Sequence, residues 1–574
     1  MLSEEVRKEA RKFTIKNAFD YGRAKPGPVI SKLLSIYPEL KQDVAGLSKE
    51  IAEIVGEVNK LSAKDLNQEF SEHRLEFEVM DKEKAERTAK PKMIIEGAEE
   101  GKVVTRFPPE PGGYITIGNA KQCILSAEFA KIYSGKIYLY FDDTNPEKSK
   151  QEFVNSIKDD LKWLGVNFSR EYYASDYIET VYGSGKRLLR QGDAYVCMCS
   201  GEDVKKSRVE KKECKHRNQL PEDNLVRFEE MLMGRYDEGQ AIVRLKGDMS
   251  SENATFRDPT LFRVKKAEHY RQGKKYSVWP TYHINTPVID NLNGVTDVIR
   301  GKEYEIWDEI NKKMLVSLGL KPPRMHYEAR LKIEGAAEGK RVVRKLLKDG
   351  DISGWNDPRL VTIAALRRRG IRSEAIWAFV LRFGMSKTDS VVSLDMLLSE
   401  NKKLIDPIAK HLFFVKDPVK LVVNGASHLS VKLRLHPTND SNFREYETAG
   451  EFYIGRDDAK TLKKGDLMAL KDLCMVKILL KGRKFITAEP ASSKKRDKII
   501  QWVSEKDYVG CSVLVPENLL GRNGEVRTDS LKVWKGYVES YATKLKEHDV
   551  VQFERVGYCI LDRKKGMQFI LTSR

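Results

Sequence analysis

The fold class is indicated first by the stretch 103–119, Val103-Val-Thr-Arg-Phe-Pro-Pro-Glu-Pro-Gly-Gly-Tyr-Ile-Thr-Ile-Gly-Asn119. Its first five residues predict a short strand, its Pro/Gly-rich middle predicts a loop, and a helix follows from about Asn119 to Tyr133. A second strand, Lys136-Ile-Tyr-Leu-Tyr-Phe141, and a second helix over about 150–164 repeat this order. Strands and helices that alternate at this spacing predict a parallel sheet of the doubly wound, Rossmann-like kind.

Parallel sheets of this kind bind ligands beyond the carboxyl ends of their strands. The loops 108–118 and 142–147 both follow such ends, so ligand-binding and catalytic residues are expected in them. The pattern breaks over 191–274, a basic insertion that carries cysteines, and the sheet resumes near Tyr276. From about 405 to the end, short β-rich runs separated by glycines and charged turns predict β-barrels.

The chain is therefore predicted to be a multidomain α/β protein. The predicted regions are a helical N-terminal domain (1–97), a Rossmann-like core (98–190 and 275–320), an inserted domain (191–274), a helical connecting domain (321–404) and a β-barrel region (405–574). The helical period of Ile51-x-x-Ile54-Val55-x-x-Val58 supports the first of these regions. A charged stretch over 80–92 is predicted to link it to the core.

The composition excludes several classes of protein. With 41% hydrophobic and 32% charged residues, the 574-residue chain is typical of a globular protein rather than a disordered one. No apolar run reaches the roughly 18 residues that span a bilayer, and the first residues form no apolar signal core, so we expect a cytoplasmic protein with no membrane partner. The net charge of +18 favours a polyanionic partner, although charge alone does not separate RNA from DNA or an acidic membrane.

The start of the first helix has the features of an anion site. Backbone N–H groups at a helix N-terminus favour anions, and Gly118 lets a flat base or ribose approach the backbone. Thr116 and Asn119 each offer a hydrogen bond to a phosphate. The alternative is that the glycines only make a turn and Asn119 only caps the helix.

Two further motifs carry charge. Asp142-Asp143 at the end of the second strand could bind a metal, an amine or a sugar hydroxyl, or could simply mark a turn. Lys340-Arg341, flanked by glycine, could follow the charge that grows on a pyrophosphate leaving group from a mobile loop. The alternative for this pair is a solvated, basic helix start.

The insertion contains a set of metal-ligand residues. Cys197, Cys199, Cys214 and His216 are the right ligands for a closed, tetrahedral, structural zinc site. Seven cysteines in so long a chain are too few for a disulfide scaffold. Reduced cysteines beside a surface histidine are the alternative interpretation.

Together these strings resemble the class I aminoacyl-tRNA synthetases, in the archaeal-type glutamyl branch of their glutamyl and glutaminyl subgroup. The resemblance is carried by the loop after the first strand, by Phe141-Asp-Asp-Thr-Asn-Pro146 and by Gly354-Trp-Asn-Asp-Pro-Arg359. Two signatures depart from the family. His-x-Gly-His is replaced by Thr116-Ile-Gly-Asn119, and Met-Ser-Lys-Arg is replaced by Glu338-Gly-Lys-Arg341.

The resemblance implies roles for individual residues. Thr116, Gly118, Asn119, Lys340 and Arg341 fall on the ATP-binding signatures, and the last two on the catalytic basic pair.

The same resemblance places the amino acid. Asp142 falls on the carboxylate that holds the α-amino group, and Tyr282 on the tyrosine that contacts the side chain. Arg300 is the informative residue, because glutaminyl relatives typically carry an uncharged residue there and a bound γ-carboxylate needs a cation with fixed donors. Arg106 is the second candidate cation, and a structural ion pair with a neighbour such as Glu303 is the alternative for Arg300.

The implied activity is attachment of L-glutamate to tRNA through glutamyl-adenylate, with ATP consumed to AMP and pyrophosphate and Mg²⁺ accompanying the triphosphate. The insertion would then hold the acceptor end of the tRNA, the barrels would bind the anticodon, and the enzyme would act as a monomer. Three alternatives stay open: a glutaminyl-tRNA synthetase, a tRNA-binding module that has lost catalysis, and a nucleotidyl transferase on the same sheet. The sequence does not decide whether tRNA for glutamine is charged as well.

Overall fold

The computed structural model describes residues 3–21, 23–74, 76–77, 97–426, 429–482, 485–492 and 498–574. The chain forms two compact units, Met1–Lys90 and Pro91–Arg574. The predicted linker over 80–92 lies outside the described residues, as do the residues on either side of it. No described helix has both the length and the apolar composition needed to cross a membrane.

The first unit is helical, as the sequence predicts. Its helices are α1 (Glu4–Tyr21), α2 (Pro26–Ile36), α3 (Val44–Val58) and α4 (Ala63–Glu72). The apolar positions of α3, among them Ile51, Ile54 and Val58, are buried in one core with residues of α1 and α2. The 3.6-residue period therefore predicted the buried face correctly.

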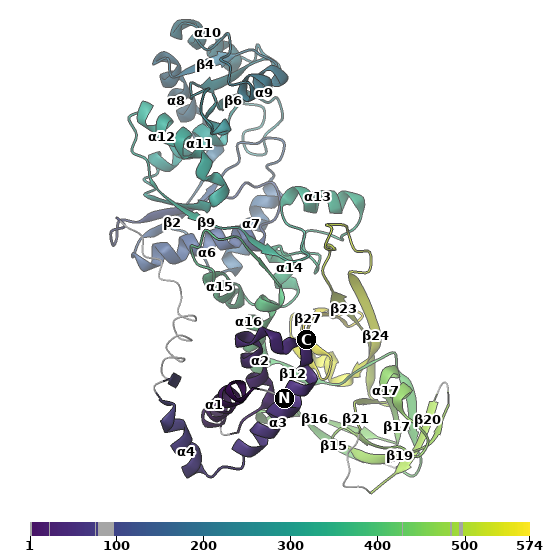
Figure 1. Ribbon diagram of the computed structural model, residues 1–574. Coiled ribbons are helices and arrows are strands. Elements are labelled where there is room, and N and C mark those ends of the chain that lie inside the picture. Colours follow the sequence, from purple (N-terminus) through teal and green to yellow (C-terminus); the bar gives the residue numbers. More distant parts are fainter. Residues whose placement is uncertain are drawn as a thin grey trace. The chain divides into compact units, whose positions relative to one another are not determined.

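The second unit begins with a parallel sheet (Figure 1). The strands are β1 (Val104–Phe107), β2 (Lys136–Phe141) and β3 (Arg170–Tyr173), and helices α6 (Ile117–Ile132) and α7 (Gln151–Trp163) connect them. All pairings are parallel, in the order β1-β2-β3. This confirms the predicted parallel-sheet core.

A second parallel pair continues the core on the other side of β1. It consists of β8 (Asp297–Gly301) and β9 (Arg324–Glu328). The backbone N–H of Thr296, just before β8, donates to the carbonyl oxygen of Val104 at 3.0 Å, which places β8 beside β1. Strands β2 and β3 thus lie on one side of β1, and the later strands β8 and β9 lie on its other side, so the strand order reverses at β1. In open parallel sheets, this reversal is where ligands bind.

The inserted residues form an antiparallel sheet of their own. Its strands are β4 (Ala194–Cys197), β5 (Ile242–Leu245), β6 (Thr260–Val264) and β7 (Val278–Pro280), and they pair in sequence order. Helices α9 (Gly201–Val209) and α10 (Pro221–Leu232) lie between β4 and β5 in the chain. Helix α8 (Ile178–Arg190) leads into this sheet, and α11 (Tyr282–Leu292) leads back to the core.

A helical region follows β9, as predicted. Its elements are β10 (Leu331–Ile333), α13 (Lys340–Asp349), α14 (Ile363–Arg368), α15 (Ser373–Leu381), β11 (Ser390–Val392) and α16 (Asp395–Ile405), preceded by α12 (Asp308–Ser317) between β8 and β9. Residues of α14 and α15 pack into the same core as α6 and α7. The connecting helices are thus continuous with the core of the parallel sheet.

The C-terminal part consists of two seven-stranded sheets and a hairpin, which confirms the predicted barrels. One sheet has the order β12-β25-β26-β27-β23-β24-β13 and the other β21-β18-β19-β20-β14-β17-β22. The strands of the first are β12 (Lys410–Leu412), β13 (Phe414–Lys416), β23 (Tyr508–Pro516), β24 (Leu531–Glu539), β25 (Val550–Phe553), β26 (Gly557–Arg563) and β27 (Gln568–Ser573).

The strands of the second are β14 (Val419–Val423), β17 (Glu451–Ile454), β18 (Leu467–Leu470), β19 (Cys474–Lys481), β20 (Phe485–Pro490), β21 (Ile499–Ile500) and β22 (Trp502–Ser504). The hairpin is β15 (Leu429–His436) and β16 (Asn439–Thr448), and α17 (Arg456–Thr461) follows β17. Each sheet encloses its own apolar core. The alternating burial of β14 and β19 shows which side chains face inward.

Candidate functional site

A cavity of about 1140 Å³ opens where the strand order reverses. Residues at the carboxyl ends of β1, β2 and β8 line it, together with residues from the insertion and from the start of α13. It brings together seven of the residues singled out in the sequence. They are Thr116, Gly118, Asn119, Asp142, Tyr282, Arg300 and Lys340. Arg106 and Arg341 are not among the lining residues.

The start of α6 forms one wall of the cavity. Thr116 precedes the helix in an extended conformation, and its backbone N–H and hydroxyl donate to the side-chain oxygen of Asn119 at 3.1 and 3.2 Å. Thr116 is therefore the N-cap residue, and Asn119, the third residue of the helix, closes a capping box with it and also faces the cavity. The two roles coexist because capping occupies only the amide oxygen.

Asp142 contributes a carboxylate beside this wall. Its Oδ1 accepts from the Thr144 hydroxyl and from the Asn285 side-chain amide, both at 3.1 Å. Burial raises the pKa of Asp142 to about 7. The neighbouring Asp143 points elsewhere and accepts from the backbone and hydroxyl of Ser175 at 2.8 Å. Asp142 thus faces the cavity, whereas Asp143 hydrogen-bonds to Ser175 and has a structural role.

Aromatic rings form another part of the cavity wall. Tyr282, at the start of α11, stacks near Tyr304 with ring centroids 6.1 Å apart. Trp307 lies 5.1 Å from Tyr282 and 4.9 Å from His283 by the same measure. All four side chains line the cavity. The phenol of Tyr282 is therefore held by neighbouring rings rather than by a polar partner.

Arg300 is 3% exposed and its ion pair is not the one anticipated. Its Nη2 donates to Oδ1 of Asp308, the first residue of α12. Glu303, the partner considered from the sequence, instead accepts from Nε of Arg330 at 2.9 Å. Tyr327 on β9 donates its hydroxyl to Asp308 Oδ2 and lies 3.5 Å from Arg300 Nη2.

The second candidate cation, Arg106, is buried below the cavity. Its Nε donates to both carboxylate oxygens of Asp290 at 3.0 and 3.1 Å. The guanidinium is 1% exposed, and its Nη1 has no partner among the described residues. This position makes Arg106 a support of the cavity floor, and Arg300 the cation that faces the space.

Lys340 begins a helix instead of standing in a loop. Gly339, with φ of +84°, makes the turn that precedes α13, a conformation that favours glycine. The Lys340 Nζ donates to the carbonyl oxygen of Glu110, and Arg344 donates to that of Gly112. Burial lowers the pKa of Lys340 to about 8. Arg341 is exposed on the same helix.

A loop of the sheet that contains β23 and β24 packs against this helix. The β23–β24 hairpin reaches toward α13 (Figure 1), and Leu519 at its tip is buried among Val343 and Leu346. The backbone N–H of Leu520 donates to the carbonyl oxygen of Gly335 at 2.9 Å. Sequence patterns gave no signal for this contact, because it joins positions almost 200 residues apart.

The insertion adds two cations to the cavity that the motifs did not identify. Arg208 donates from Nε and Nη2 to the carbonyl oxygens of Arg257 and Asp258, at 3.0 and 2.8 Å. Arg263 lines the cavity with a buried Nε that has no hydrogen-bond partner among the described residues. Within the described part of the chain neither pairs with a carboxylate, and burial lowers the pKa of Arg208. Only the overall basic charge of the insertion hinted at them.

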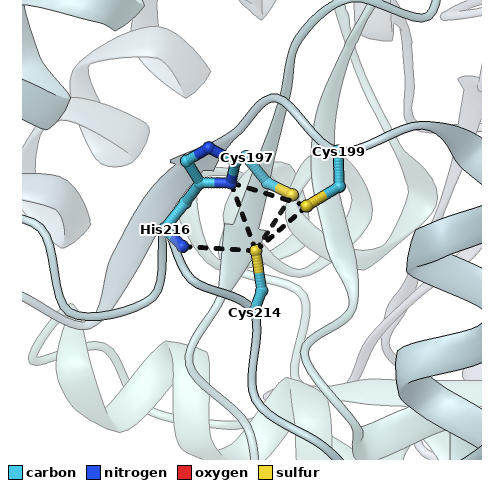
Figure 2. Close-up of side chains that lie close together, drawn as sticks. All are labelled: Cys197, Cys199, Cys214 and His216. Carbon is cyan, nitrogen blue, oxygen red and sulfur yellow. Dashed lines mark hydrogen bonds between the residues drawn. The ribbon is translucent and has the colours of Figure 1, made fainter.

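The four metal-ligand residues of the insertion converge (Figure 2). Their ligand atoms all lie within 4.8 Å of one another. Cys214 Sγ lies 3.6 Å from Cys197 Sγ and 3.4 Å from Cys199 Sγ, and His216 Nδ1 lies 3.3 Å from Cys214 Sγ. Four ligands about 2.1–2.3 Å from a tetrahedral zinc are separated by roughly these distances. The donors therefore fit a closed zinc site.

Comparison with known proteins agrees with this geometry. Residues 102–406 match the family described as tRNA synthetases class I (E and Q), catalytic domain. Residues 409–486 and 499–562 match the two anticodon-binding domain families of the same enzymes. More than half of the chain lies in the catalytic match, which includes the parallel sheet, the insertion and α13.

Two curated relatives match over almost their full length. The glutamate–tRNA ligase of Nitrosopumilus maritimus (strain SCM1) is 37% identical over 575 residues, which is 100% of both chains. That of Pyrococcus furiosus is 38% identical over 573 residues, which is 97% of this chain and 98% of the relative. With a catalytic family match and full-length relatives of this similarity, the chain belongs to the class I tRNA synthetases of the glutamate and glutamine (E and Q) group.

Proposed function

We propose that this protein attaches L-glutamate to tRNA at the expense of ATP. The observation that carries the proposal is the single cavity that combines a carboxylate for an amine, an arginine for a carboxylate, and a lysine with a helix start for a triphosphate. Relatives that are glutamate–tRNA ligases match the whole chain. The reaction has two steps, and different walls of the cavity serve each.

In the first step, ATP lies against the start of α6 and the Lys340 ammonium. Backbone N–H groups near Gly118 and the side chains of Thr116 and Asn119 contact the nucleotide. An oxygen of the glutamate α-carboxylate attacks the α-phosphorus, the bond to the β-phosphate breaks, and pyrophosphate leaves. Lys340 stabilises the charge that grows on this leaving group, and magnesium accompanies the triphosphate as part of the substrate.

Glutamate is held at both ends. The ionised Asp142 carboxylate pairs with the α-ammonium group, and Tyr282 packs against the side chain. The γ-carboxylate accepts hydrogen bonds from Arg300, whose charge and fixed donors suit a carboxylate better than an amide. Arg106 supports this arrangement from below through its pair with Asp290.

In the second step, the terminal ribose hydroxyl of the tRNA attacks the acyl carbon. The bond between that carbon and the phosphate oxygen breaks, and AMP leaves. Arg208 and Arg263 face the cavity from the insertion and carry charge that no carboxylate neutralises within the described residues. They are suited to hold the phosphates of the tRNA acceptor end.

The Cys197–Cys199–Cys214–His216 cluster is proposed to hold a structural zinc ion. Zinc would tie the end of β4 to the segment between α9 and α10 and so fix the position of Arg208. Four protein ligands leave no open coordination position, so the ion would bind no substrate. The two C-terminal sheets would bind the anticodon loop, where unstacked bases can be read.

The direct test is a charging assay with purified protein, ATP, magnesium and radiolabelled glutamate. We expect acid-precipitable glutamate on tRNA for glutamate. Separate assays with tRNA for glutamine would define the range of tRNAs accepted. If the protein binds tRNA but charges it with neither glutamate nor glutamine, it is a tRNA-binding module. Charging with glutamine alone would make it a glutaminyl-tRNA synthetase, and either result would refute the proposal.

A further inference from the structure

The counter-ion of Arg300 lies outside the cavity. Asp308 accepts from Arg300 Nη2, but Asp308 itself is not a lining residue, and its side chain is 39% exposed. Tyr327 closes the arrangement, because its hydroxyl donates to Asp308 and lies 3.5 Å from Arg300 Nη2. Three side chains from β8, β9 and α12 thus form one hydrogen-bonded group.

The backbone places these three groups together. Arg300 and Tyr327 are direct partners in the register of β8 and β9. Asp308 begins α12, where a helix N-terminus favours an acidic side chain. The nearer acidic residue, Glu303, is committed to Arg330. The partner of Arg300 is therefore set by the fold, not by proximity in sequence.

The arrangement leaves one part of the guanidinium for a ligand. Arginine has five N–H donors in a planar fork. Asp308 accepts from Nη2 and Nε is buried, whereas Nη1 makes no hydrogen bond within the described residues. A long arginine side chain that is already ordered loses less conformational freedom when it binds a carboxylate. Without a counter-ion, a guanidinium this deeply buried would also be costly.

We propose that Asp308 and Tyr327 are positioning residues that fix Arg300 and thereby set the preference for glutamate over glutamine. The inference rests on the proposed function and adds the residues that control its side-chain specificity. The guanidinium of a fixed Arg300 presents only N–H donors to the substrate side chain. A γ-carboxylate accepts from them, whereas the NH₂ of a γ-amide opposes another donor.

The clamp, defined as Asp308 with Tyr327, has a specific consequence for selectivity. A guanidinium released from the clamp can turn away and tolerate an amide. Loss of the clamp should therefore weaken glutamate binding more than glutamine binding. A residue that only stabilised the fold would change both amino acids and ATP together.

The test measures ATP–pyrophosphate exchange with tRNA present, with glutamate or glutamine as the amino acid. Asp308→Ala should raise KM for glutamate about tenfold or more, with kcat and KM for ATP within about threefold of the wild type. The glutamate-to-glutamine ratio of kcat/KM should fall by a similar factor. The size follows from loss of a charge-assisted hydrogen bond that orders the ligand-binding group.

The matched control is Glu309→Ala. Glu309 is also acidic and in the first turn of α12, but it accepts from Asn253 at 2.7 Å and not from Arg300. It should leave KM for glutamate within about threefold. An equal rise in both variants, or a rise below threefold for Asp308→Ala, would overturn the proposal.

Two further variants guard against misfolding. Asp308→Asn keeps an oxygen acceptor in place and should raise KM for glutamate less than Asp308→Ala. Tyr327→Phe should also raise it, and the double variant Asp308→Ala/Tyr327→Phe should be no worse than Asp308→Ala alone, since both residues act through Arg300. Additive effects would contradict a shared clamp. A wild-type protein that shows no glutamate-dependent exchange would refute the proposed function itself, which is a different result from an active enzyme insensitive to Asp308.

Discussion

The Lys340 ammonium group donates to the carbonyl oxygen of Glu110, and this contact joins the start of α13 to the loop after β1. Gly113 lies in the same contact, where an added Cβ would be 2.8 Å from Trp355 and 3.1 Å from Lys340 Cγ. The loop and the helix are therefore closely packed. The lysine that would meet the triphosphate is held by the loop that would bind the nucleotide.

Replacing this lysine tests the assignment of the leaving-group site. Lys340→Ala should lower kcat for exchange by about a hundredfold or more, equivalent to ~2.7 kcal/mol, because the charge on pyrophosphate loses its stabilising partner. Lys345→Ala removes the same charge from an exposed position of α13 and should have little effect. Steady-state kinetics of both variants provide the comparison. Equal losses would show that Lys340 acts only through helix charge.

The pH dependence should report Asp142 and Lys340. Burial raises the pKa of Asp142 to about 7, and only its ionised form can pair with an ammonium group. Below pH 7, kcat/KM for glutamate should therefore fall, by up to about tenfold per unit. Burial lowers the pKa of Lys340 to about 8, so a decline should also begin above pH 8 as the ammonium loses its proton. A flat profile between pH 6 and 9 would contradict both assignments.

Arg208 should contact the acceptor end and no other part of the tRNA. Arg208→Gln should weaken binding of intact tRNA about fivefold to tenfold and reduce the salt slope by about one unit. Binding of tRNA trimmed of its last nucleotides should not change. Lys205→Gln, exposed on the same helix, controls for general charge loss. If trimmed and intact tRNA respond alike to Arg208→Gln, the residue contacts another part of the tRNA.

The metal content of the insertion can be measured directly. We expect one zinc ion per chain by elemental analysis, lost in Cys199→Ser together with a lower melting temperature. Cys474→Ser is the control, since Cys474 lies on β19 and outside the cluster. A purified protein without stoichiometric zinc, or zinc retained in Cys199→Ser, would remove the ligand assignment.

Local patterns predicted the parts of the fold that depend on short-range physics. The alternation of strands and helices over 103–164 gave the parallel sheet, and the rule about strand ends placed Asp142 and Gly118 in one cavity. A basic helix start at Lys340 was the alternative to a mobile loop flanked by glycines, and the structure has the helix start. One of these glycines, Gly339, provides the turn into the helix.

The remaining features depend on contacts between distant segments. Asp308 is eight residues from Arg300, a spacing that no strand or helix pattern singles out. The two residues meet because β8 ends at Gly301 and α12 begins at Asp308. Arg208 reaches the cavity only because the insertion folds over it, and Leu519 reaches α13 only through a barrel hairpin. No periodicity or motif encodes such pairings. The sequence therefore identified Arg300 but neither its partner Asp308 nor the positions of Arg208 and Leu519.

The cavity is proposed to select glutamate through Arg300. The most direct test is ATP–pyrophosphate exchange, with tRNA present, by the wild type and by Arg300→Gln, using glutamate and glutamine separately. We expect exchange with glutamate in the wild type, and a loss of at least about a hundredfold in kcat/KM for glutamate in Arg300→Gln, with KM for ATP within about threefold. Exchange with glutamine alone, or an equal loss for glutamate and ATP, would contradict the account.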